Sequence, residues 1–161
     1  MQAIICTGAE SSGSRLAVEI IESGGYERDD AFISGAERIV IHRSLPHGPV
    51  MPDLAGMVNV LRGRGYNVRA LVMVRNPFVV AESQVKAGHA VDTGQAFAKQ
   101  EAALAFVGQQ FEHCRCPFLI LPYEALVANS DEVQAQLAVY LELPDSPSVE
   151  VYNGNEKYYS A

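Results

Sequence analysis

An eight-residue stretch near the amino terminus, residues 8–15 (GAESSGSR), separates two segments of very different pattern. The segment before it, residues 3–7, is apolar and predicts a buried strand; the segment after it, residues 16–23, begins amphipathic and predicts a helix. A glycine-bounded loop in this position turns backbone N–H groups inward, and the helix adds the positive end of its dipole. The sequence therefore predicts an anion-binding loop, and the usual anion there is a nucleotide phosphate.

The end of this loop departs from that of common ATP-binding loops. The spacing of Gly8 and Gly13 fits the Walker A frame, but Ser14 and Arg15 stand where the frame requires Lys and then Ser or Thr. The Lys normally reaches the terminal phosphates, and the hydroxyl normally holds magnesium. We therefore expect a phosphate loop without the ATPase residues; a turn without function is the alternative.

Composition limits the class of protein. A chain of 161 residues suffices for one domain with a substantial core, and no apolar run approaches the ~20 residues of a membrane span. Without a signal-type amino terminus, a cytoplasmic protein is expected. The net charge of −7 argues against a broad nucleic-acid surface, although a nucleotide needs only local Arg side chains.

The three cysteines do not suggest a disulfide framework, because their number is odd. Cys6 lies in the first predicted strand and is expected to be a small buried side chain. Cys114 and Cys116 are two ligands at most, too few for a zinc site. No metal site is predicted.

Apolar strands alternate with amphipathic helices along the chain. Strands are predicted at residues 3–7, 38–42, 68–74 and 117–121, and helices at 16–23, 54–62, 77–86, 93–112 and 130–141, with a helical turn at 123–127. Residues 26–36 are predicted to be a loop and residues 149–161 an irregular tail. Uniformly apolar strands are typical of a parallel sheet covered on both faces. We predict a single α/β domain over residues 1–161, with three α/β/α layers, a central parallel sheet of four to five strands and a P-loop nucleotide-binding type of fold.

Polar groups follow three of these strands. They are the glycine loop (residues 8–15), the segment 42–44 (HRS) and Arg75. Ligands of parallel sheets bind at the carboxyl ends of the strands, so these groups are expected to form one site.

Two further motifs stand downstream at matching places. Residues 74–83 (VRNPFVVAES) place an Arg at a strand end and a Ser eight residues later, and residues 122–127 (PYEALV) precede a helix that ends in LELP. With the glycine loop, this set resembles the sulfotransferases that use 3′-phosphoadenosine 5′-phosphosulfate (PAPS), over roughly residues 3–144 and most closely a small bacterial or phage type. Residues 153–158 (NGNEKY) are similar to a carboxyl-terminal lysine motif of bacterial members.

The resemblance implies where PAPS, and the product PAP, would bind. The loop would hold the 5′-phosphosulfate through Gly8, Ser11, Ser12, Gly13, Ser14 and Arg15. Arg75 and Ser83 would hold the 3′-phosphate, since a guanidinium binds phosphate through two parallel hydrogen bonds and a hydroxyl adds a third. Lys157 would be a further donor-binding residue. In the alternative interpretation Arg75 is a surface ion-pair partner, for example of Glu124, and Ser83 an ordinary helix serine.

Two departures from the family pattern affect the catalytic residues. The family places a basic residue before the Ser-Gly of its loop, where this chain has Ser11, so Arg15 is expected to supply the positive charge. The family's catalytic His, in a Thr-His-Leu-Pro segment, has no counterpart in register within residues 42–47 (HRSLPH). His42 is the predicted base and His47 is the second candidate; the remaining alternative is a base from elsewhere in the chain, or no base.

The expected function is transfer of a sulfuryl group from PAPS to a hydroxyl or amine acceptor, with no metal ion. Arg15, aided by Arg43 or Lys157, would stabilise the leaving phosphate. A non-catalytic nucleotide-binding relative is the first alternative, and a small P-loop kinase, which would lack its loop Lys and Walker B Asp, is the second. Acceptor contacts are expected in residues 26–36, 45–52 and 88–94. The chain is short for the family, so the acceptor side is expected either to be open or to be completed by a partner subunit, as in a homo-oligomer.

Overall fold

Five parallel strands form the centre of the molecule in the computed structural model, which describes residues 1–46 and 50–159. The strands are β1 (Gln2–Ala9), β2 (Glu27–Arg28), β3 (Arg38–Leu45), β4 (Asn67–Val74) and β5 (Phe118–Pro122). Their order across the sheet is β2-β3-β1-β4-β5, and every neighbouring pair is parallel. The central strand β1 therefore delivers its following loop between the carboxyl ends of β3 and β4.

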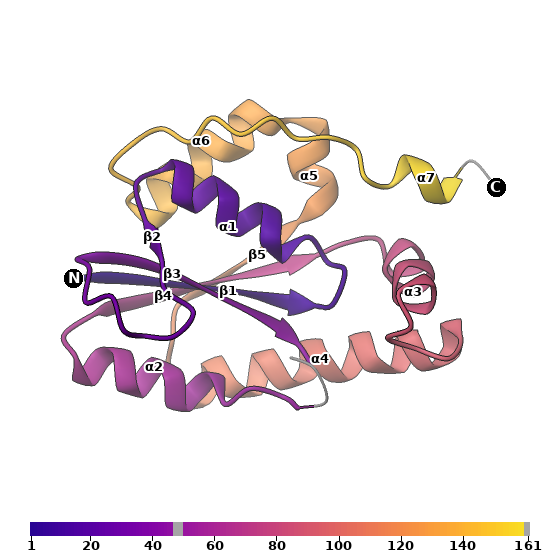
Figure 1. The fold of residues 1–161 in the computed structure, drawn as a ribbon, viewed down its shortest axis with the longest axis horizontal. Coiled ribbons are helices and arrows are strands. Elements are labelled where there is room, and N and C mark those ends of the chain that lie inside the picture. Colours follow the sequence, from indigo (N-terminus) through magenta and orange to yellow (C-terminus); the bar gives the residue numbers. More distant parts are fainter. Residues whose placement is uncertain (47–49, 160–161) are drawn as a thin grey trace.

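Helices cover both faces of this sheet (Figure 1). They are α1 (Ser14–Ser23), α2 (Leu54–Gly63), α3 (Pro77–Lys86), α4 (Thr93–His113), α5 (Tyr123–Ala128), α6 (Ser130–Leu141) and α7 (Glu156–Tyr159). One face carries α1, α5 and α6, and the other carries α2 and α4. The chain after α6 runs back toward the carboxyl ends of the strands, where α7 lies near α3. Within residues 1–46 and 50–159, none of these helices is long and apolar enough to cross a membrane.

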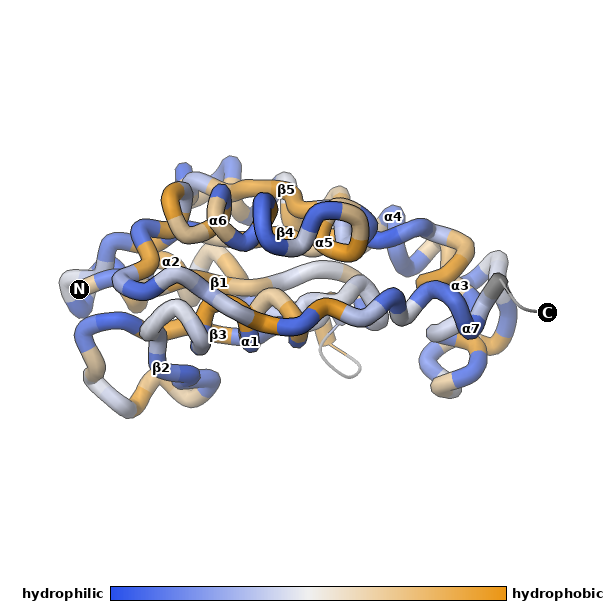
Figure 2. The backbone as a smooth tube through the Cα atoms, turned by 90° about the horizontal axis from the view of Figure 1, so that it is seen from above, coloured by the Kyte–Doolittle hydropathy of each residue, from blue (hydrophilic) through white to orange (hydrophobic). Residues whose placement is uncertain are grey.

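Alternate residues of the strands supply the two halves of the core. Ala3 and Ile5 pack with Phe111 and the other buried side chains of α2 and α4, whereas Ile4 and Cys6 pack with α1, α5 and α6. In Figure 2 the helices alternate between hydrophobic and hydrophilic residues along their turns, as amphipathic helices do. Because both faces of β1 are buried, its residues 3–6 (AIIC) form an unbroken apolar run.

The predicted α/β class and parallel sheet are confirmed, and each predicted strand lies within an observed one except at one residue of the last. Two elements were not predicted. The strand β2 lies inside residues 26–36, expected to be a loop; it has two exposed polar residues and therefore no hydrophobic pattern. The short helix α7 lies in the tail that was expected to be irregular.

The three cysteines are buried and free, which confirms the prediction for Cys6. Burial, with a smaller effect of Cys114, raises the pKa of the Cys116 thiol to about 11, and burial also raises the pKa of Cys6. These thiols therefore stay protonated at neutral pH and act as small apolar side chains.

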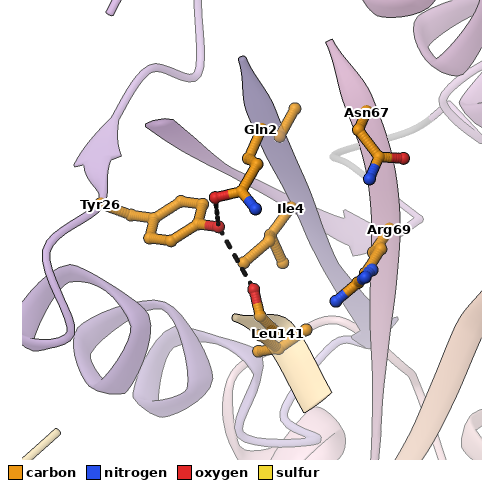
Figure 3. A pocket seen from close by; sticks show the side chains of 7 residues that line it. Gln2, Ile4, Tyr26, Asn67, Arg69 and Leu141 are labelled. Carbon is orange, nitrogen blue, oxygen red and sulfur yellow. Dashed lines mark hydrogen bonds between the residues drawn. The ribbon is translucent and has the colours of Figure 1, made fainter. Parts of the chain in front are cut away.

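A local hydrogen-bond network closes the end of the sheet at which the strands begin (Figure 3). The Tyr26 hydroxyl donates to Gln2 Oε1 at 3.0 Å and to the Leu141 carbonyl at 3.3 Å, which joins α6 to the start of β1. The cavity beside it has a volume of only about 10 Å³. This end therefore holds no more than a water molecule, and space for a ligand lies elsewhere.

The core on the α4 side supports a first prediction. Phe111 of α4 is fully buried, so Phe111→Ala removes a large side chain from a packed site. We expect the free energy of unfolding to fall by about 3–5 kcal/mol in urea denaturation. Leu104→Ala is the matched control, because Leu104 lies on the same helix but is 44% exposed, and a change within about 0.5 kcal/mol is expected. Equal losses in the two variants would contradict this description of α4.

Candidate anion-binding site

The glycine loop (residues 8–15) joins β1 to α1 in a conformation that few side chains allow. Gly8, Ser11 and Gly13 have positive φ angles of 150°, 71° and 94°. A Cβ atom on Gly8 would lie 2.4 Å from the Met73 carbonyl oxygen of β4, and one on Gly13 would lie 2.8 Å from the ring of Tyr123. Glycine is therefore required at both ends of the loop, where its backbone packs against neighbouring strand ends.

The loop ends at the open amino terminus of α1. Gly13 is the N-cap, and no side chain caps the helix. The Leu16 and Ala17 N–H groups donate to the Gly13 carbonyl, whereas the amides of Ser14 and Arg15 precede the first helical carbonyls that could accept from them. These amides and the helix dipole make this end of α1 locally positive.

A cavity of about 630 Å³ opens beside the loop, far larger than the one at the opposite end of the sheet. It is bounded by the loop, the end of β3, the first residue after β4, the segment after α3, and α7. The lining residues are Glu10, Ser11, Gly13, Ser14, Arg15, His42, Ser44, Arg75, His89 and Lys157. The structure thus brings together the three strand ends that the sequence predicted to converge, and adds Lys157 from the tail.

Local charge in this cavity is opposite to the charge of the whole chain. Arg15, Arg75 and Lys157 line it, although the chain carries a net charge of −7. The only lining carboxylate among the described residues, Glu10, has the imidazole of His89 3.8 Å away. An anion entering the cavity therefore meets an excess of positive charge.

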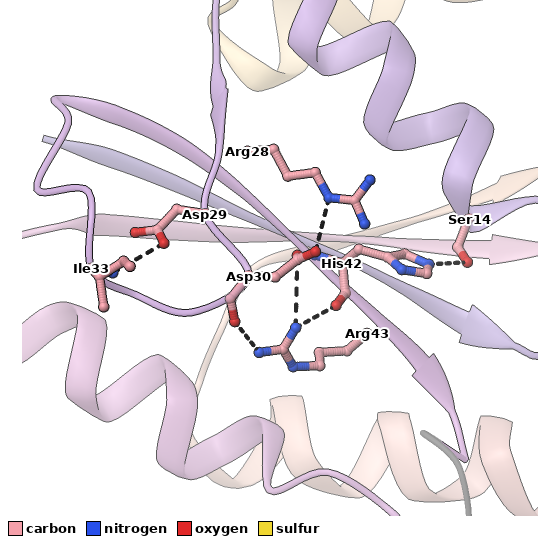
Figure 4. A network of polar contacts seen from close by, with 7 residues as sticks. All are labelled: Ser14, Arg28, Asp29, Asp30, Ile33, His42 and Arg43. Atoms are coloured by element: carbon pink, nitrogen blue, oxygen red, sulfur yellow. Dashed lines mark hydrogen bonds and ion pairs between the residues drawn. The ribbon is translucent and has the colours of Figure 1, made fainter.

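His42 is buried at the side of the cavity, 8% exposed, near the end of β3. Its Nε2 lies 2.8 Å from the hydroxyl of Ser14, which is the first residue of α1, and its backbone N–H donates to Asp30 Oδ1 at 2.7 Å (Figure 4). The amino terminus of α1 therefore fixes one ring nitrogen of His42, and the segment that precedes β3 fixes its backbone.

Asp30 holds this segment together, and sequence reasoning missed it. Burial raises the pKa of Asp30, but the His42 N–H and the charges of Arg28 and Arg43 outweigh burial and hold that pKa below its usual value. Asp30 Oδ2 accepts from Arg28 Nε at 2.8 Å, and Asp30 Oδ1 lies 3.7 Å from Arg43 Nη1. Arg43 is thus engaged with Asp30 and does not line the cavity. No local pattern reveals this cluster, because His42 and Arg43 lie 12 and 13 residues after Asp30.

Asp29 orders the neighbouring turn. Its carboxylate accepts from the backbone N–H groups of Ile33 and Ser34, both at 3.0 Å. Burial raises the pKa of Asp29, and these hydrogen bonds reverse the shift and hold the pKa low. Residues 26–36 are therefore a structured connection, and none of them lines the cavity, although acceptor contacts were expected there.

Arg75 connects the loop to the tail. Its Nε donates to Asn155 Oδ1 at 2.6 Å and its Nη1 donates to the Ser11 carbonyl at 3.2 Å. The guanidinium carbon lies 4.5 Å from the centre of the Tyr123 ring. The alternative ion pair with Glu124 is not found among the described residues, where Glu124 Oε1 instead accepts from Asn155 Nδ2 at 3.0 Å.

The tail is fixed where it crosses these residues. The Tyr123 hydroxyl donates to the Tyr152 carbonyl at 2.8 Å and accepts from the Gly154 N–H at 2.9 Å. A Cβ atom on Gly154 would lie 3.0 Å from the Tyr123 hydroxyl, and Asn155 is only 4% exposed. The NGN part of the tail motif is therefore the sequence signal for this close contact, while the role of Tyr123 could not be predicted.

Some predicted site residues lie outside the cavity lining. The Ser12 side chain is buried beneath the loop at 2% exposure, and its hydroxyl has no hydrogen-bond partner within the described residues. Gly8 packs against β4 and contributes to the shape of the loop rather than to the lining. Ser83, in α3, hydrogen-bonds to the phenol oxygen of Tyr158. His47 lies outside the described residues.

Comparisons with protein-family models, curated protein sequences and solved structures found no match to this chain. The site is therefore interpreted from its own geometry.

The contact of Gly8 with β4 gives a second prediction. In Gly8→Ala the new methyl group would collide with the Met73 carbonyl, so we expect a loss of about 1–3 kcal/mol in the free energy of unfolding. Gly108→Ala is the control: Gly108 lies inside α4, a methyl group there would have no atom within 4 Å, and a gain of about 0.5–1 kcal/mol is expected. Chemical denaturation measures both, and a Gly8→Ala protein as stable as the parent would contradict the described loop.

Proposed function

We propose that this chain binds PAPS and transfers its sulfuryl group to a hydroxyl or amine acceptor. One observation carries the proposal: a single cavity has the glycine loop and the start of α1 on one side and the Arg75 guanidinium on another. A P-loop type of nucleotide site with two separate anion positions fits a ligand that carries phosphates at both ends of its ribose. ATP has its phosphates in one chain and has no use for the second position.

Each anionic end of the donor has a matching group. The 5′-phosphosulfate would accept from loop amides and from Arg15, which is exposed and lines the cavity. The 3′-phosphate would lie against Arg75, whose neighbour Lys157 also lines the cavity. Charge-assisted hydrogen bonds of this kind are the strong ones in nucleotide recognition.

The proposed reaction is an in-line displacement at sulfur. The acceptor atom forms a bond to sulfur, the bond between sulfur and the bridging phosphate oxygen breaks, and the electron pair stays on PAP. His42 takes the acceptor proton, and the loop amides with Arg15 stabilise the charge that develops on PAP. The sulfuryl group carries less charge than a phosphoryl group, so this step needs no metal ion.

A non-catalytic nucleotide-binding protein is the second candidate function. The observation that favours it is the burial of His42, whose Nε2 is already within hydrogen-bond distance of the Ser14 hydroxyl. Ser11 also lacks the positive charge expected at its position. A small kinase is less well supported, because Ser14 replaces the Lys that reaches the terminal phosphates.

Donor binding is the first prediction of this proposal. PAP at 100 times its Kd should stabilise the fold by about 2.7 kcal/mol without magnesium, whereas ATP with magnesium should give no comparable shift.

Arg75→Lys keeps the charge but loses the planar pair of donors, so we expect PAP affinity to fall about 10- to 100-fold. AMP, which lacks the 3′-phosphate, is the control ligand, and its affinity should fall much less in Arg75→Lys. Thermal shift and calorimetry measure these effects; stabilisation by ATP with magnesium alone would favour the kinase.

The base is the second prediction. We expect His42→Ala to lower turnover by about 10²- to 10⁴-fold while PAP affinity stays within a few-fold, measured as PAP release with a panel of phenols, sugars and amines. His113→Ala, at the exposed end of α4, should change neither quantity. Unchanged turnover in His42→Ala together with loss in His47→Ala would assign the base to His47. PAP binding without turnover on any acceptor would favour the non-catalytic protein.

A further inference from the structure

Three cations surround one tyrosine of the tail. Lys86 Nζ lies 4.8 Å and Lys157 Nζ lies 5.1 Å from the centre of the Tyr158 ring, and the Arg75 guanidinium carbon lies 6.0 Å from it. Ser83 lies one turn before Lys86 in α3, and its hydroxyl is the side-chain hydrogen-bond partner that lowers the pKa of the Tyr158 phenol. The ion pairs recorded within residues 1–46 and 50–159 include none of these three cations.

This arrangement gathers positive charge around an electron-rich but formally neutral group. Burial raises the pKa of the Tyr158 phenol, but the Ser83 hydrogen bond and the charges of Lys157 and Arg75 outweigh burial and bring that pKa below its usual value. The surroundings of the phenol oxygen therefore favour an anion. A phosphomonoester, with almost two negative charges and three acceptor oxygens, suits the same donors better than a phenol does.

We propose that Ser83, Lys86, Arg75 and Lys157 form a phosphomonoester subsite, and that the Tyr158 phenol occupies it until a ligand phosphate displaces the tyrosine. The inference rests on the proposed function, because the 3′-phosphate of PAP is the phosphate expected to enter. It adds Lys86 as a phosphate-binding residue and gives Tyr158 the role of a built-in competitor.

The Tyr158 side chain can leave the subsite while the tail stays attached to the rest of the domain. The hydrogen bonds of Gly154 to Tyr123 and of Asn155 to Arg75 and Glu124 hold the chain just before α7. The four-residue helix α7 follows directly and carries Tyr158. A rotation about the side-chain torsions of Tyr158 therefore removes the phenol from Ser83 without breaking these anchoring bonds and without moving Lys157 of the same helix.

Calorimetry with PAP and AMP tests the subsite on the full chain. Tyr158→Phe removes the phenol oxygen, so PAP should bind about 2- to 10-fold more tightly and AMP equally well. Lys86→Gln should weaken PAP about 10-fold and leave AMP unchanged. Two matched controls should change neither affinity. One is Tyr152→Phe, at an exposed tyrosine of the same tail, and the other is Arg38→Gln, at the opposite end of the strands.

The outcomes separate this inference from the proposed function. Weaker or unchanged PAP binding in Tyr158→Phe overturns the competitor role, and unchanged PAP binding in Lys86→Gln overturns the subsite, while PAP binding to the parent chain leaves the proposed function standing. If the parent chain binds neither nucleotide, the proposed function fails. Binding of inorganic phosphate then tests the subsite on its own. Phosphate should shift the ring NMR signals of Tyr158, assigned with Tyr158→Phe; signals that do not move overturn the inference.

Discussion

The Arg75 guanidinium joins segments that are distant in the sequence. It follows β4, donates to the Ser11 carbonyl of the glycine loop, donates to Asn155 of the tail and lies over the ring of Tyr123, the first residue of α5. Arginine has five N–H donors in a rigid plane, and the bonds recorded within the described residues use two of them. Arg75 can therefore hold the loop and the tail in place and still present donors to a ligand.

Arg75 holds the loop and the tail in place and also faces the proposed ligand, so the docking of the tail and the binding of the ligand are coupled. Asn155 and Tyr123 fix the orientation of Arg75 before any ligand arrives, so little conformational entropy remains to be lost on binding. The same contacts attach the tail, and through it α7, to the edge of the cavity. If a bound anion alters the contacts of Arg75 and Lys157, it changes the free energy of tail docking. Thermodynamic linkage then requires that tail docking change the free energy of anion binding by the same amount.

The sequence was informative where structure depends on neighbouring residues and uninformative where it depends on distant ones. A buried strand such as Asn67–Val74 is recognised by its apolar run (residues 70–74, ALVMV), and the loop from Gly8 to Gly13 by its two glycines, so the sheet and the converging strand ends could be predicted. The contacts of Asp30 with the His42 backbone and of Ser83 with Tyr158 join residues 12 and 75 positions apart, and neither pair has a pattern of its own.

The unusual end of the glycine loop and the histidine of β3 belong to one arrangement. Ser14 occupies the position of the Walker A lysine, and its hydroxyl lies 2.8 Å from the buried Nε2 of His42. A lysine there would bring a long ammonium side chain against an imidazole that is only 8% exposed, where the hydroxyl of Ser14 already lies at hydrogen-bond distance. A chain that keeps His42 at this place therefore needs a small hydroxyl at position 14, so positive charge must come from Arg15 and Arg75 instead. The loss of the lysine is in this sense a consequence of the histidine, whichever anion the cavity binds.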